Sequence, residues 1–70
     1  MPAVAVFISP ASVDRWIHEM FAAGKATTME DCASVIGISR IGLYKLKERG
    51  ATKTQALAMA AVLRDVEPFN

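Results

Sequence analysis

The sequence has very few residues of the types that build metal centres and disulfides. It holds one cysteine, Cys32, which excludes a disulfide framework within the chain and fits a reducing compartment. Its one histidine, His18, has no third ligand near it in sequence, so we expect neither a metal site nor a cofactor. We expect Cys32 to be a buried packing residue.

Long apolar runs are also missing. No run approaches the roughly 20 residues needed to span a bilayer, so we expect no membrane segment. The apolar opening, Met1–Ile8, lacks the basic region of a signal peptide and is short for one. Together with the single thiol, this favours a cytoplasmic protein.

Signatures of catalysis are absent as well. There is no glycine-rich phosphate loop, and no histidine is suitably placed as a base beside any of the serines. We therefore expect that the protein is not an enzyme and that it takes no small-molecule ligand.

What the sequence does contain is the composition of one small globular domain. Its 70 residues are 53% hydrophobic and 21% charged. A domain of this size buries only about 60% of its unfolded surface, so a partner subunit could supply stability that the core lacks.

Charge is segregated along the chain. The net charge is +1, but residues 37–53 carry five basic residues and one acidic residue, whereas the rest of the chain carries three basic and six acidic residues. A local basic stretch in an otherwise acidic chain is typical of a phosphate-binding face, although a solvated helix explains the charges equally well.

Apolar spacing predicts that the chain is helical. Ser9-Pro10 is a good helix start, and an apolar stripe follows before Gly24 ends the helix; its members are Val13, Trp16, Ile17, Met20 and Phe21. Either Thr27 with Glu30 or Thr28 with Asp31 can cap a second helix, which we expect to reach about Ile36. Gly37 then stops it as a left-handed residue.

Two further helices are predicted after Gly37. Ser39 can cap a third helix with Leu43 and Leu46 inside, and Gly50 closes it. Thr52 with Gln55 can cap a fourth helix, whose inner face we expect to hold Leu57, Ala60, Ala61 and Leu63.

The amino-terminal residues 3–8 have the β-branched and aromatic content of a strand, with no partner strand elsewhere in the chain. We expect them either to pair with a second subunit or to pack on the helices as an arm. The predicted fold class is therefore all-α: a small bundle of four to five helices, with an arm over residues 1–8 and a helix-turn-helix domain over residues 9–70.

The informative segment is residues 29–48, MEDCASVIGISRIGLYKLKE. Two short helices around the turn Gly37-Ile38-Ser39 form a compact helix-turn-helix, in which Ala33 is small where the helices cross. This motif resembles the DNA-binding helix-turn-helix of the Cro and repressor (XRE-like) proteins of temperate phages. The fourth helix resembles that of very small phage and prophage regulators, including autorepressors encoded beside anti-CRISPR genes.

The face of the third helix supports this interpretation independently. If Leu43 and Leu46 point inward, the helical period turns outward Arg40, Ile41, Tyr44, Lys45 and Glu48. Basic donors beside apolar groups suit the major groove, which presents guanine acceptors and thymine methyl groups. The alternative is that Ile41 and Tyr44 pack under the arm or against another subunit.

The resemblance implies which residues contact DNA. Base contacts are expected from the start and middle of the third helix: Ser39, Arg40, Ile41, Tyr44 and Lys45. Phosphate contacts are expected from Thr28, at the start of the second helix, and from residues at or beyond the end of the third: Lys47, Arg49 and Lys53.

The expected function is sequence-specific binding of double-stranded DNA by a transcriptional regulator, most simply a phage or prophage autorepressor. One motif contacts about one half-site, so we expect a homodimer on an inverted repeat. Two apolar regions could form the dimer surface: the amino-terminal arm, or the carboxy-terminal end around Val62, Val66 and Phe69. The alternative function is a protein-interaction module, such as an antitoxin, adaptor or inhibitor.

Overall fold

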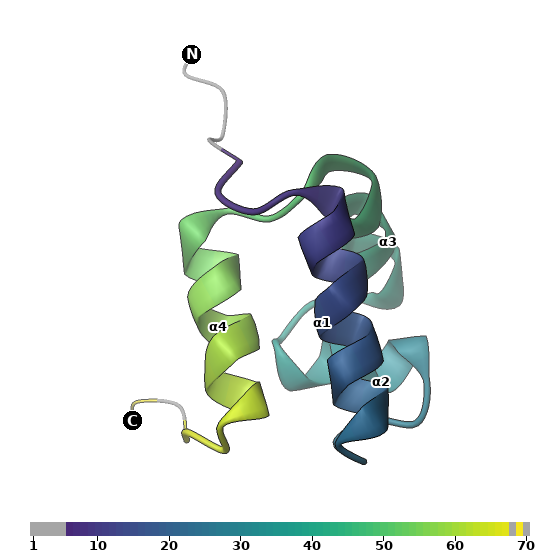
Figure 1. Ribbon diagram of the computed structural model, residues 1–70, viewed down its shortest axis with the longest axis vertical. Helices are drawn as coiled ribbons and strands as arrows, with labels where there is room; N and C mark the ends of the chain where they lie inside the picture. The colour runs from purple at the N-terminus through teal and green to yellow at the C-terminus, as the bar shows by residue number, and fades with distance from the viewer. Residues whose placement is uncertain (1–5, 68, 70) are drawn as a thin grey trace.

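The computed structural model describes residues 6–67 and 69. Four helices and no strand are found in this part of the chain, as Figure 1 shows. The bounds of the helices are α1 Pro10–Ala22, α2 Met29–Val35, α3 Arg40–Arg49 and α4 Lys53–Leu63. The prediction of a small all-α bundle is confirmed, with four helices.

Each helix begins at a serine or threonine whose hydroxyl oxygen accepts a backbone N–H of the first turn. Ser9 caps α1, with Pro10 as its first residue, and Ser39 caps α3. Of the two alternatives for α2, Thr28 is the cap, and its oxygen accepts the N–H of Asp31. Thr52 and Gln55 form a full capping box at α4, as predicted.

The core lies mainly between α1, α2 and α3, and α4 contributes Met59 to it. Its buried apolar residues are Val13, Trp16, Ile17, Met20, Ala26, Cys32, Ala33, Leu43, Leu46, Ala51 and Met59. The apolar stripe of α1 is confirmed except at its end, because Phe21 remains 39% exposed. Gly24 follows α1 in the left-handed region, at φ +71°, and leaves Phe21 on the last turn, where little packs over it.

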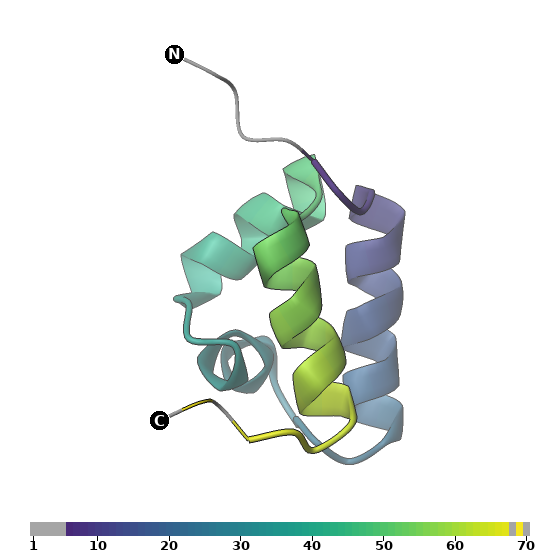
Figure 2. The ribbon, with the colours of Figure 1, turned by 90° about the vertical axis from the view of Figure 1, so that its left-hand side faces the viewer.

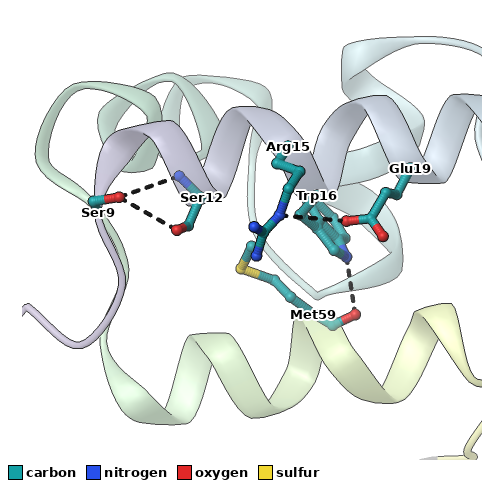
Figure 3. A network of polar contacts seen from close by, with 6 residues as sticks. All are labelled: Ser9, Ser12, Arg15, Trp16, Glu19 and Met59. Carbon is teal, nitrogen blue, oxygen red and sulfur yellow. Dashed lines mark hydrogen bonds and ion pairs between the residues drawn. The ribbon is translucent and has the colours of Figure 1, made fainter.

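The predicted inner face of α4 is confirmed only in part: Leu63 packs against the core and Ala61 is half-buried, but the other two residues are not on the inner side. Leu57 is 63% exposed and Ala60 is also exposed, whereas the core side chain of this helix is Met59. The buried indole of Trp16 donates from Nε1 to the backbone oxygen of Met59 at 2.9 Å, as Figure 3 shows. Because residues 54–63 carry no charge, the apolar pattern of this helix does not distinguish its two sides.

The described part of the amino-terminal segment packs on the helices, in agreement with one of the two alternatives, but it also finds a backbone partner within the chain, which was not expected. Ile8 forms an isolated antiparallel bridge with Ala51, between α3 and α4, and the backbone of Phe7 also donates to the Ala51 oxygen. Figure 1 shows this segment running beside the α3–α4 connection. Gly50 has φ +90°, and a Cβ there would overlap the Ile8 oxygen, so only glycine fits this approach. Residues 1–5 of the predicted arm lie outside the described residues.

The turn between α2 and α3 sets the direction of α3. Gly37 has φ +77°, as expected for the residue that ends a helix in the left-handed region. The N–H groups of Gly37 and Ile38 return to the oxygens of Ser34 and Ala33 at 3.0 Å, which satisfies the end of α2. Figure 2 shows α2 almost end-on while α3 lies across the view, so the two helix axes cross steeply.

Candidate nucleic-acid interface

The outward face of α3 is fixed by two leucines. Leu43 is fully buried and Leu46 is 7% exposed, so the side of the helix opposite to them faces solvent. Five exposed residues occupy that side, in agreement with the helical period: Arg40, Ile41, Tyr44, Lys45 and Glu48. We call this set the α3 face.

The α3 face combines cations with large apolar groups. Ile41 is 68% exposed and Tyr44 is 47% exposed. No described residue forms an ion pair with Arg40, Lys45 or Glu48. The arm bonds to Ala51, and its Val6 shares a shallow depression with Lys45 and Arg49, but the arm does not extend to Ile41 in the described residues 6–67 and 69. The two cations are therefore available to an outside partner.

Ser39 stands at the tip of the face. Its hydroxyl oxygen accepts the N–H of Gly42 at 3.0 Å, which holds the side chain at the start of α3. The hydroxyl hydrogen stays free to donate outward, because the cap uses only the oxygen. Ser39 and Arg40 therefore lie at the amino-terminal end of α3, directly after the turn.

Thr28 lies next to this tip. A shallow depression between the starts of α2 and α3 is lined by Thr28, Met29, Glu30, Asp31, Arg40 and Tyr44. The structure thus brings the predicted phosphate-contacting Thr28 together with two predicted base-contacting residues. The Thr28 hydroxyl oxygen accepts the Asp31 N–H, and the hydroxyl also contributes to lowering the pKa of the Asp31 carboxylate.

Two carboxylates, Glu30 and Asp31, share that depression, and the sequence alone indicates only a capping role for them. The hydroxyl and the N–H of Thr27 both donate to the Asp31 carboxylate, and they hold the pKa of Asp31 below its ordinary value. Asp31 is therefore ionised at neutral pH, and Glu30 beside it is exposed. The sequence places both carboxylates in the first turn of α2, but only the structure shows that they lie beside Arg40.

The three basic residues predicted to contact phosphate differ in their surroundings. Lys47 is partly covered: its Nζ lies 3.8 Å from the Asp14 carboxylate of α1 and 5.4 Å from the centre of the Tyr44 ring. Arg49, the last residue of α3, is exposed and has no ion-pair partner among the described residues. Lys53, the first residue of α4, is exposed, with its Nζ 5.9 Å from the centre of the Phe7 ring. A phosphate would therefore meet Arg49 and Lys53 freely and would compete with Asp14 for Lys47.

Apart from Lys47, whose Nζ lies near Asp14 of α1, the candidate residues follow α3 from its start to just beyond its end. Thr28 and Ser39 mark one end, the base-contact candidates follow α3, and Arg49 with Lys53 mark the other end, where α3 meets α4. Lys53 is the first residue of α4 and therefore lies where the chain passes from α3 into α4.

The lone histidine and the lone cysteine, His18 and Cys32, lie outside the α3 face. His18 is exposed on α1, whereas Cys32 is fully buried in the core, and burial raises the pKa of its thiol with a smaller contribution from the charge of Asp31. A protonated, buried thiol reacts slowly, so Cys32 is a packing residue. The described residues hold no cluster of three or more side chains that could bind a metal ion, and none of their helices is long and apolar enough to cross a membrane.

Comparisons of the chain with protein-family models, with curated proteins and with solved structures found no match.

Proposed function

We propose that this protein binds double-stranded DNA in a sequence-specific manner and regulates transcription. The observation that carries the proposal is the α3 face: exposed Arg40 and Lys45 lie beside exposed Ile41 and Tyr44 on one side of one helix. A helix that served only as a solvated surface would gain nothing from two large apolar groups outside the core. The major groove accepts one helix, and its base edges offer both acceptors and methyl groups.

Phosphate contacts would position the protein on the duplex. Arg49 and Lys53 project from one end of the face, and a serine and a threonine hydroxyl lie at the other end. Such contacts fix register and orientation without reading sequence, and each neutralised phosphate makes the affinity more sensitive to salt.

The working unit in this proposal is a homodimer on an inverted repeat, which places two α3 helices in successive major grooves roughly 34 Å apart. One subunit measures 38 × 28 × 18 Å, a size at which two subunits can cover that spacing. Val6, Phe7, Val66 and Phe69 are all more than half exposed, so both predicted dimer surfaces remain open to a second copy. Occupancy of its own promoter by such a dimer would make the protein a cytoplasmic autorepressor of the phage or prophage kind.

The experiment is a mobility-shift titration with DNA from upstream of the protein's own gene and with scrambled DNA of equal length, at two salt concentrations. Tight binding that prefers the upstream probe and weakens steeply with salt is the expected result. Absence of binding to both probes at micromolar protein and low salt would contradict the proposal.

A protein-interaction module is the second candidate, and Leu57 favours it. This leucine is 63% exposed on a helix that has no charge between Lys53 and Arg64, which is the kind of surface that proteins use for partners. The same titration separates the candidates, because binding to a protein partner through this uncharged side would not require DNA.

A further inference from the structure

Ile41 is the most exposed large apolar residue of the four helices, at 68%. It is the second residue of α3, where its β-branched side chain loses rotamer freedom and gains little packing in return. Folding alone therefore does not account for isoleucine at this position.

The surroundings of Ile41 on α3 are donors, although the Glu30 side chain of α2 lines the same shallow depression as Arg40 and Ile41. Arg40 precedes it, Lys45 lies one turn further along the same face, and the Ser39 hydroxyl lies at the helix start. Arginine and lysine side chains donate hydrogen bonds and accept none, whereas the Ile41 side chain neither donates nor accepts them. A ligand that fits this part of the surface must present acceptors with an apolar group beside them.

Base pairs present that combination in the major groove. Guanine offers the acceptors O6 and N7, and the one apolar group on any base edge is the C5-methyl of thymine. Neighbouring residues of a helix point about 100° apart, so Arg40 and Ile41 reach different base pairs.

We propose that Ile41 is a specificity-determining residue that packs on the C5-methyl group of a thymine, close to a guanine contacted by Arg40. The proposal rests on the function proposed above and adds the chemical group that is read. Removing one buried methyl group weakens binding about fourfold, and about fifteenfold when both half-sites of a dimer site lose it.

The test begins with selection of duplexes from a random pool by the wild-type protein. In the enriched duplex, each thymine is replaced singly by deoxyuridine, which removes the methyl group and leaves base pairing intact. Affinities are measured by mobility shift for the wild type, for Ile41→Ala, and for Val35→Ala as the matched control. Val35 is an aliphatic residue of α2 that is 44% exposed and lines a different depression, together with Met20 and Val62.

A single deoxyuridine in one half-site, at the thymine that Ile41 contacts, is expected to weaken binding by the wild type and by Val35→Ala about fourfold, and to leave binding by Ile41→Ala unchanged. Thermal unfolding checks that both variants fold. Equal affinity of the wild type for every thymine and deoxyuridine probe would overturn this inference and leave the proposed function standing. The same holds if Ile41→Ala still distinguishes thymine from deoxyuridine as the wild type does. Failure to enrich any sequence would overturn the proposed function itself, so the two failures are distinguishable.

Discussion

Helices α3 and α4 are similar in length, at 10 and 11 residues, but their sequences constrain them very differently. Helix α3 has two core leucines and five charged residues, so only one orientation keeps the charges in water. Helix α4 is uncharged from residue 54 to residue 63, and several orientations would bury similar apolar area. The comparison teaches that charge on the outer side of a helix defines its inner side as firmly as the apolar residues do.

The largest difference between the two helices is expected in the stability lost when one leucine of each is replaced by alanine. Leu43→Ala removes a side chain that is fully buried and should destabilise the protein by about 2–5 kcal/mol, because a cavity remains. Leu57→Ala, at a side chain that is 63% exposed, should change stability by less than about 1 kcal/mol. Urea unfolding of both variants measures this difference, and equal losses would mean that Leu57 is buried by a second subunit.

Trp16→Phe tests what orients α4. This substitution removes the buried hydrogen bond from Nε1 to the Met59 oxygen and should cost about 1–3 kcal/mol in unfolding free energy. Phe21→Leu, on the exposed end of the same helix, serves as the control and should cost much less. A stability loss no greater than that of the control would show that the indole N–H does not hold α4 in place.

Arg40→Ala and Arg64→Ala compare two exposed arginines, one at the start of α3 and one just after α4. On the proposed function, Arg40→Ala should cost about 1–3 kcal/mol on the specific site and relax the preference at one base pair. Arg64→Ala should have little effect on the same probe. Mobility shifts on specific and scrambled DNA separate the roles, since equal weakening on both sequences would reduce Arg40 to a phosphate contact.

The smallest expected effect is on the pH dependence of stability, and it compares the residues that cap α2 and α4. The pKa of Asp31 in the folded protein lies below its ordinary value. The hydrogen bonds that its carboxylate accepts from Thr27 therefore stabilise the protein fully when the pH is above that ordinary pKa. This contribution disappears as the pH falls through the lowered pKa. The capping box of α4 uses Gln55, an amide that does not titrate.

Asp31→Asn should therefore remove part of the stability loss below about pH 4, and Gln55→Glu should add to it. Acid titration of the unfolding free energy, read against the wild type, measures both changes. Identical acid profiles for the three proteins would rule out a role for the Asp31 carboxylate in capping α2.

How much of the fold was predictable follows from the same contrast. The caps, the turn at Gly37 and the buried sides of α1 and α3 were predictable, because each depends on residues close together in sequence. The orientation of α4 depends on Trp16, 43 residues away from Met59, and no local pattern encodes such a contact. The bridge from Ile8 to Ala51 is long-range in the same way.

In the candidate site, too, features encoded within one helix were predictable and features that depend on contacts between helices were not. The residues of the α3 face were predictable from the period of the helix, and the structure places them together. Two features needed the tertiary structure: the ion pair that ties Lys47 to Asp14, and the depression that brings Glu30 and Asp31 beside Arg40. Both arise where different helices meet, which the spacing within one helix cannot show.

The most direct test of the account is to map the DNA contact on the protein itself. A ¹⁵N-labelled sample, at 7.6 kDa per chain, is titrated with the duplex that the protein selects, and amide chemical shifts are followed by NMR. The account predicts the largest changes over residues 39–45 and at Arg49, with the amides of residues 57–61 little affected. Large changes along α4 with α3 unmoved would contradict it.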